Sequence, residues 1–284
     1  MIVAGAVEVV RDLTFASPGG SDLKLDLYLP PERSGSCPIV LYLHGGAFMV
    51  GDRTVFAQER LEPVARTGIA IASAQYRFSD IATYPAQVHD VKAAVRWLRA
   101  HAGEYGYGAE HVGAWGASAG GYLSLMLGVT SGSVDHEGTL GEHLDHSSSV
   151  EAVTAWFAVT DVPLADGQRL PGDRELPPFI TGPPPQPSVL ARLLGVETVS
   201  EDPELAVAAS PVTYAAATRA SFLLMHGDRD GLMSEEQSQV MHQALVGAGA
   251  DSTLMLIAGA NHEDPAFHGP ASLGAGTGFF RGRL

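Results

Sequence analysis

Hydrophobic and polar side chains alternate near the start of the chain, between residues 23 and 29. Leucines occupy positions 23, 25, 27 and 29, and Lys24, Asp26 and Tyr28 lie between them. A period of two is typical of a strand with one buried face, and two prolines end the pattern. We therefore expect an antiparallel strand at the beginning of a sheet.

Short apolar runs follow at residues 39–43, 69–74 and 112–115, each bounded by glycine or polar residues. Such runs are expected of strands that are covered on both faces, as in a parallel sheet. Between the last two, apolar residues at positions 91, 94, 95 and 98 recur at helical spacing. They predict a helix from about Asp90, which can cap its start, to Ala102, which precedes a glycine.

The alternation of strand and helix continues to the end of the chain. Three more apolar runs predict strands over residues 153–159, 221–226 and 253–257. A helix is expected over about 235–246, with Ser234 and Gln237 as a capping box. This order predicts the α/β class, with a mostly parallel central sheet flanked by helices.

Two segments interrupt the alternation, at residues 131–149 and 163–195. The first is polar and the second is rich in proline, and long irregular segments in a compact domain are often lids or binding loops. The alternative is a solvated or partly disordered excursion. Because strands and helices continue afterwards, we expect a single domain over residues 1–284 with these segments as a lid or cap.

Composition narrows the possible partners. The chain has 284 residues, 45% of them hydrophobic, and a formal net charge of −15, which repels phosphate backbones and anionic headgroups. We expect no nucleic-acid or membrane partner, and the oligomeric state stays open, with a dimer among the options. Cys37 is the only cysteine, so no disulfide or thiolate cluster can form. This fits a cytoplasmic protein, although a processed secreted chain would look the same.

Candidate chemistry begins at Ser118, in the run Gly116-Ala117-Ser118-Ala119-Gly120. A Gly-x-Ser-x-Gly match is weak alone, but this one follows an apolar strand and opens an apolar helical segment. That strand–turn–helix context is typical of a nucleophilic serine held on a sharp turn. We therefore predict that Ser118 is the nucleophile of a serine hydrolase.

A serine hydroxyl needs a base and an orienting carboxylate, which we expect later in the chain in the order acid, then histidine. Asp230 follows the predicted strand at 221–226, with Asp228 as the rival acid in the same turn. His262 follows the last predicted strand, and His268 is the nearest alternative. We predict Asp230 and His262.

An oxyanion of the tetrahedral intermediate requires backbone N–H donors. His44 is followed by Gly45, Gly46 and Ala47 after a predicted strand, and Ala119 follows the nucleophile. We predict an oxyanion hole from the last four of these residues, with His44 as a structural residue.

Three aromatic residues could line an apolar acyl or alcohol pocket, although they could equally be core. They are Phe48, Tyr122 and Trp156. Histidines and acids between 135 and 146 could ligate a metal, but their spacing matches no known ligand set. We expect no metal and no cofactor.

Several motifs in one order resemble the small carboxylesterases of the hormone-sensitive-lipase and feruloyl-esterase-like branch of the α/β hydrolases. They are Leu25-Asp26-Leu27-Tyr28-Leu29-Pro30, His44-Gly45-Gly46-Ala47-Phe48, Gly51-Asp52, Tyr76-Arg77, Pro85-Ala86, Asp90, Trp97-Leu98, Gly116-Ala117-Ser118-Ala119-Gly120-Gly121 and Ser210-Pro211. The resemblance spans about residues 7–265.

The resemblance implies cofactor-free hydrolysis of short acyl or aryl esters, with Ser118, Asp230 and His262 as the triad. Two departures stand out. Ala47 replaces the usual third glycine, and the glycine-rich stretch after His262 gives no clear indication of a final packing helix. The function hypothesis is a serine carboxylesterase. An amidase, formamidase or biosynthetic tailoring hydrolase with the same triad, or a non-catalytic ligand-binding homologue, remains an alternative.

Overall fold

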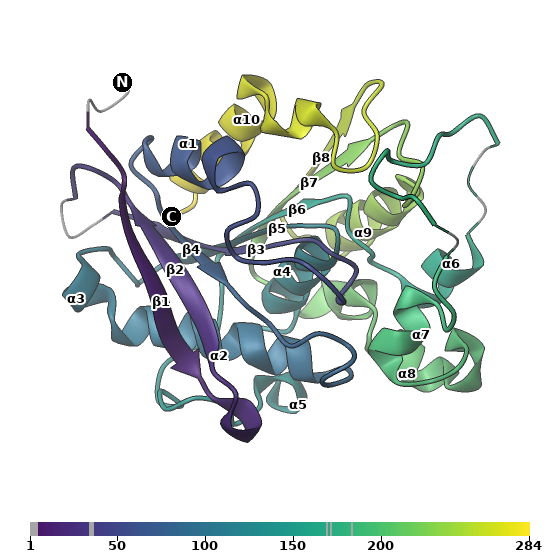
Figure 1. Ribbon diagram of the computed structural model, residues 1–284, viewed down its shortest axis with the longest axis horizontal. Helices are drawn as coiled ribbons and strands as arrows, with labels where there is room; N and C mark the ends of the chain where they lie inside the picture. Colours follow the sequence, from purple (N-terminus) through teal and green to yellow (C-terminus); the bar gives the residue numbers. More distant parts are fainter. Residues whose placement is uncertain (1–4, 34–36, 169, 171, 183) are drawn as a thin grey trace.

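A computed structural model describes all residues except 1–4, 34–36, 169, 171 and 183. An eight-stranded sheet runs through the described part, in the order β1-β2-β4-β3-β5-β6-β7-β8 (Figure 1). Its strands are β1 (Glu8–Ala16), β2 (Leu23–Leu29), β3 (Ile39–Leu43), β4 (Ala70–Ala74), β5 (Val112–Ala117), β6 (Ala152–Trp156), β7 (Ser221–Gly227) and β8 (Ser252–Ile257). The central position of β5 places its carboxyl end near the middle of one sheet edge.

The pairing of the strands follows the predicted pattern. β1 pairs with β2 and β2 pairs with β4 in antiparallel fashion, and every later pair is parallel. The alternating leucines therefore start the sheet with antiparallel strands, and the short apolar runs form its buried parallel part. This confirms the predicted α/β class with a mostly parallel sheet.

Helices cover both faces of the sheet (Figure 1). They are α1 (Glu62–Ala65), α2 (Ala86–Ala100), α3 (Ala102–Tyr105), α4 (Ala119–Val129), α5 (Val134–Glu137), α6 (Val162–Gly167), α7 (Val189–Leu194), α8 (Pro203–Ala208), α9 (Glu236–Gly247) and α10 (Pro270–Arg281). The helices α2, α4 and α9 enclose one apolar cluster, and α1 and α10 enclose a second on the opposite face. Burial of these two clusters is the main stabilising contribution to the fold.

The helix predicted from Asp90 begins one turn earlier, at Ala86, with Pro85 in the N-cap position. Asp90 is fully buried inside the helix and is not its cap. Its carboxylate instead accepts hydrogen bonds from the Arg77 backbone and guanidinium, the shortest at 2.6 Å. The prediction of an N-cap was wrong because a tertiary ion pair uses this side chain.

The capping box predicted from Ser234 and Gln237 is also absent. The helix α9 begins after Glu235, and no side chain caps it. Gln237 is fully buried, and its side-chain oxygen accepts from the Thr160 and Asp161 amides at 2.8 and 2.9 Å. Its side chain therefore fastens the helix to the loop after β6.

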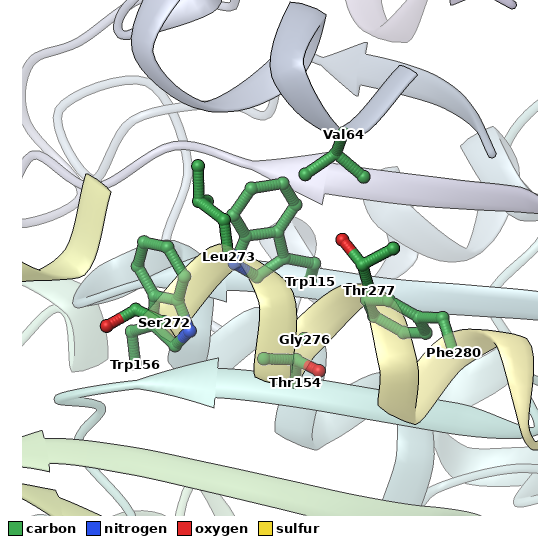
Figure 2. A pocket seen from close by; sticks show the side chains of 9 residues that line it. All are labelled: Val64, Trp115, Thr154, Trp156, Ser272, Leu273, Gly276, Thr277 and Phe280. Carbon is green, nitrogen blue, oxygen red and sulfur yellow. The ribbon is translucent and has the colours of Figure 1, made fainter. Parts of the chain in front are cut away.

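A final packing helix, α10, forms despite its glycines. Pro270 lies in its first turn, and Phe279 and Phe280 are buried against the sheet. Figure 2 shows a cavity of about 10 Å³ beneath this helix, lined among others by Trp115 and Trp156. A space of this size holds no more than about one water molecule, so it is not a substrate site.

Candidate active site

Ser118 lies at the turn between β5 and α4, in a backbone conformation that is rare for a residue with a side chain (φ 53°, ψ −117°). The turn is possible because two glycines flank it. A Cβ on Gly116 would lie 2.2 Å from the Gly120 carbonyl oxygen, and a Cβ on Gly120 would lie 1.9 Å from that of Leu43. Such close backbone approach requires glycine, and it presents the hydroxyl at the carboxyl end of the central strand.

His262 and Asp230 reach Ser118 from two other loops, those that follow β8 and β7. The Nε2 atom of His262 lies 3.0 Å from Ser118 Oγ, and its Nδ1 atom lies 2.7 Å from Asp230 Oδ2. A carboxylate only accepts hydrogen bonds, so Nδ1 carries the proton and Nε2 of the neutral ring accepts from the hydroxyl. The structure thus brings together the three residues that the sequence nominated.

Asp230 is fully buried, yet it remains ionised. Burial would raise the pKa of its carboxyl, but hydrogen bonds and charge from His262 and His226 outweigh burial and lower that pKa far below its usual range. Its second oxygen accepts from the amides of Leu232 and Met233 at 2.8 and 2.7 Å. The carboxylate is therefore fixed in place and charged.

The two rival residues have other partners. Asp228 accepts from the Gly259 amide at 2.7 Å, which links the loop after β7 to the loop after β8. His268 lies beside Arg60, 2.7 Å from its guanidinium, and its ring packs on Phe56. Within the described residues, no hydrogen bond connects Asp228 or His268 to Ser118.

The segment after β3 curls beside the nucleophile. Gly46 has a φ of 128°, and a Cβ there would lie 1.9 Å from the Val50 carbonyl oxygen, so no other residue fits. His44 stacks on Tyr76 with ring centroids 4.7 Å apart, and its Nδ1 lies 2.6 Å from the Gly45 carbonyl oxygen. Burial lowers the pKa of His44, so the ring is neutral and braces this segment.

Three backbone amides at this place lack protein acceptors. Within the described part of the chain, no hydrogen bond leaves the N–H of Gly46, Ala47 or Ala119. Ala119 begins α4, so its amide also lies at the positive end of a helix. Gly45, the fourth predicted residue, approaches Ser118 closely, because a Cβ on it would lie 3.4 Å from the serine Cβ.

Comparison with known proteins identifies the chain. The profile of the BD-FAE family matches residues 25–245. The chain belongs to the BD-FAE family. This confirms the resemblance to carboxylesterases.

Relatives of this BD-FAE chain include the esterases LipC and LipQ of Mycobacterium tuberculosis. LipC is 28% identical over 71% of this chain and 46% of LipC, and LipQ is 25% identical over 82% of this chain and 52% of LipQ. The chain thus spans about half the length of the curated relatives it matches.

Solved structures share the fold almost throughout. A truncated carbohydrate esterase from gut microbiota has a TM-score of 0.84 and 28% identity, with 98% of this chain and 96% of that one covered. An esterase of Thermogutta terrifontis with bound propionate has a TM-score of 0.74 and 24% identity over 98% and 94% of the two chains. Its similarity supports the fold alone. The predicted α/β-hydrolase fold is confirmed.

The three aromatic residues of the predicted pocket do not lie together. Phe48 and Tyr122 pack edge to face at 5.3 Å, and the Tyr122 hydroxyl donates to the Ala209 carbonyl. Trp156 belongs to the apolar cluster under α10 on the other face, beside Ser272 in Figure 2. Its carbonyl oxygen still supports the turn, because it accepts from the Ser118 amide at 2.9 Å.

The structure adds polar residues that the sequence reasoning missed. Asn261 precedes His262, and its side-chain oxygen accepts from the amides of Gly231 and His262 at 2.9 and 2.7 Å. It therefore holds the loop of the acid and the loop of the base together. Glu263 follows His262 and pairs with the buried Arg60. Their adjacency to His262 was the available signal.

The two polar segments take different positions. Residues 131–149 lie along α2, where Glu137 contacts Lys92 and Arg96. In the segment 163–195, of which 169, 171 and 183 lie outside the described residues, Arg174 donates to the Asp230 carbonyl oxygen at 3.1 Å. Asn261 donates its amide to the Glu175 carbonyl oxygen at 2.8 Å. The second segment thus contacts both site loops.

Two further searches covered the described residues only. No three His, Cys, Asp or Glu side chains there converge as a metal site would require. None of the helices described is long and apolar enough to cross a membrane.

Proposed function

We propose that the protein is a serine carboxylesterase that hydrolyses small acyl or aryl esters through an acyl-enzyme. The observation that carries the proposal is the hydrogen-bonded series Ser118–His262–Asp230 beside backbone amides that have no protein acceptor. Membership of the BD-FAE family and relatives named esterases support it. The acidic net charge supports a small molecule, and no nucleic acid or membrane, as the partner.

In the first step, His262 Nε2 takes the proton of Ser118 Oγ as the oxygen attacks the ester carbonyl. Asp230 holds the ring in the required tautomer and stabilises the imidazolium that forms. His262 then returns the proton to the leaving alcohol, which leaves the acyl group on Ser118. Water attacks this acyl-enzyme along the same proton route, and release of the acid restores the hydroxyl.

Negative charge develops on the carbonyl oxygen during both steps. We assign its stabilisation to the amides of Gly45, Gly46, Ala47 and Ala119, because those of Gly46, Ala47 and Ala119 have no acceptor in the described chain. Donors that are already oriented need no reorganisation when the charge appears. One such donor typically contributes about 3–4 kcal/mol.

The substrate side of the proposal rests on Phe48 and on residues 163–195. Phe48 directly follows the oxyanion segment and has a left-handed backbone (φ 57°). With Tyr122 it forms an apolar wall that suits an acyl group. The segment 163–195 is proposed as the lid, because it contacts both site loops. A cytoplasmic location is proposed on the single cysteine.

An active-site fluorophosphonate tests the nucleophile. We expect labelling of Ser118 and a loss of esterase activity of roughly 10⁴-fold or more in Ser118→Ala. Ser124→Ala is the matched control, because this buried serine on α4 donates to the Gly120 carbonyl and does not contact the triad. Labelling elsewhere, or full activity in Ser118→Ala, would refute the proposal.

A substrate panel tests the reaction. We expect hydrolysis of p-nitrophenyl esters, fastest for short acyl groups, over aryl amides and formamides of matched size. Hydrolysis of the amides alone would replace the esterase with an amidase. Labelling without turnover of any of these substrates would favour a binding homologue.

A further inference from the structure

A buried ion pair lies next to the candidate nucleophile and takes no part in the proposed triad. Arg60 is completely buried, and its guanidinium donates to the Tyr42 hydroxyl at 2.8 Å and to a carboxylate oxygen of Glu263. The same guanidinium lies over the rings of Phe56 and Trp156. Arg60 is therefore fixed on every side, and it fixes the carboxylate in turn.

Glu263 has a backbone that a long side chain rarely adopts, with a φ of 55°. Glycine or asparagine would take this conformation more readily, and strain of this kind is concentrated at functional sites. Glu263 also directly follows His262. A glutamate at this position is thus costly, and the cost needs a reason beyond the turn itself.

The second oxygen of the carboxylate, Oε1, faces the nucleophile. A Cβ placed on Gly45 would lie 3.2 Å from Glu263 Oε1 and 3.4 Å from Ser118 Cβ, so both atoms border the same small space. Within the described residues, no hydrogen bond to Oε1 is present, and the side chain is 13% exposed. The oxygen is a fixed acceptor with room for a donor from outside the protein.

A free carboxylate at this distance would oppose the negative oxyanion of the proposed reaction. Arg60 removes most of that repulsion, because its full charge lies against the other oxygen of the same group. The pair therefore presents a strong hydrogen-bond acceptor to a substrate with little net charge. An acceptor of this kind selects a substrate that carries a donor close to the ester.

We propose that Glu263 is a substrate-binding residue that accepts a hydrogen bond from a hydroxyl group next to the ester. The favoured substrates are then esters of polyhydroxy alcohols, such as acylated sugars, over esters of simple alcohols. This inference rests on the proposed esterase function and names its substrate class.

The experiment compares three acetates that differ at one group: ethyl acetate, 2-hydroxyethyl acetate and 2-methoxyethyl acetate. For the wild-type protein, we expect kcat/KM to be about 10-fold or more higher for the hydroxyl ester than for either other ester, as expected for one charge-assisted hydrogen bond. In Glu263→Gly, whose backbone fits the left-handed turn, this ratio falls toward one.

A second variant changes the direction of the preference. In Glu263→Gln, the amide oxygen must face Arg60, which has only donors, and the NH₂ group then faces the substrate. We expect the methoxy ester, which only accepts hydrogen bonds, to gain on the hydroxyl ester. Asp251→Asn, which alters the distant pair with Arg283, leaves all ratios unchanged.

A purely structural role for Glu263 predicts a different result. Its variants would then lose activity on the three esters equally, with the ratios of the wild-type protein preserved, and this would overturn the inference. A wild-type protein without preference for the hydroxyl ester would also overturn it. Failure of the proposed function is distinct, because Ser118 would then resist the fluorophosphonate and no ester would be cleaved.

Discussion

The two polar segments, 131–149 and 163–195, read alike in the sequence but are attached to different parts of the molecule. The first is fixed to α2 by buried charges. Lys92 Nζ donates to Glu137 at 2.8 Å, to the Thr130 carbonyl at 2.9 Å and to Ser148 Oγ at 3.2 Å, with its side chain fully buried. Arg96 is 3% exposed and pairs with the same carboxylate. This segment belongs to the helical layer.

The second segment is attached to the loops of the candidate site by more exposed contacts. Arg174 pairs with Glu235 and donates to the Asp230 carbonyl oxygen. The pair between Asp173 and Arg229 is 66% and 58% exposed. Ion pairs in water contribute little, so this attachment is weak. The difference teaches that polarity alone does not identify a lid, and we keep that proposal for residues 163–195.

The largest expected effect is on stability, from Glu137→Ala. Removal of the carboxylate leaves the buried Lys92 and Arg96 without their common partner. We expect a loss of about 3 kcal/mol in the free energy of unfolding, measured by denaturant titration, with kcat/KM unchanged for the folded protein. The exposed neighbour Asp135→Ala should cost less than about 0.5 kcal/mol. A fall in kcat/KM without loss of stability would contradict the assignment.

The next effect is on activity, from Asn261→Ala. The side-chain oxygen of Asn261 accepts from the amides of Gly231 and His262, so its removal frees both site loops. We expect kcat/KM to fall about 10- to 100-fold, on the scale of one or two lost hydrogen bonds. Asn261→Asp is the matched control, since it keeps the acceptor and loses only the donor to Glu175. Equal losses in both variants would assign the effect to the lid contact.

A smaller effect is expected for Arg174→Met, which breaks the attachment of the second segment. The unfolding free energy should fall by about 1 kcal/mol or less. Cleavage by a protease within residues 163–195 should become faster, because this segment opens more often. In Arg229→Met, where the lost pair is exposed, neither quantity should change measurably. If Arg174→Met left proteolysis unchanged, the segment would be held by other contacts.

The smallest effect is a pH dependence that belongs to the first segment. Burial lowers the pKa of His136, whose ring nitrogens contact Ser133 and Tyr84. A base with a lowered folded pKa stabilises fully above its unfolded pKa, about 6.5, and the stability is lost as the pH falls through the folded value. We expect this slope below pH 6.5 to become shallower in His136→Asn, measured by urea unfolding at several pH values. An unchanged slope would assign it to other groups, such as His89, whose pKa burial also lowers.

The sequence predicted the sheet because its signals are local. The alternating leucines and the short apolar runs each form the strand expected, within a residue or a few at the ends. The run expected over 153–159 ends at Trp156, because Phe157 has a left-handed backbone (φ 38°) that the apolar pattern does not reveal. Side chains with tertiary partners, such as Asp90 and Gln237, were misassigned for the same reason.

The candidate site divides in the same way. Ser118, Asp230 and His262 were nominated because each lies in a short motif at a strand end. Arg60 and Glu263 are separated by 203 residues, and no local pattern connects them. A buried ion pair of this kind appears only when the folded chain places its members together.

The order of the strands has a consequence for synthesis and assembly. The nucleophile and the oxyanion segment follow β5 and β3, whereas the acid and the base follow β7 and β8, within residues 221–284. A growing chain therefore exposes Ser118 long before any base can reach it, and the hydroxyl stays inert until the last two strands dock. Cutting the connection before β7 would divide the proposed chemistry into two silent fragments, whose reunion would switch it on.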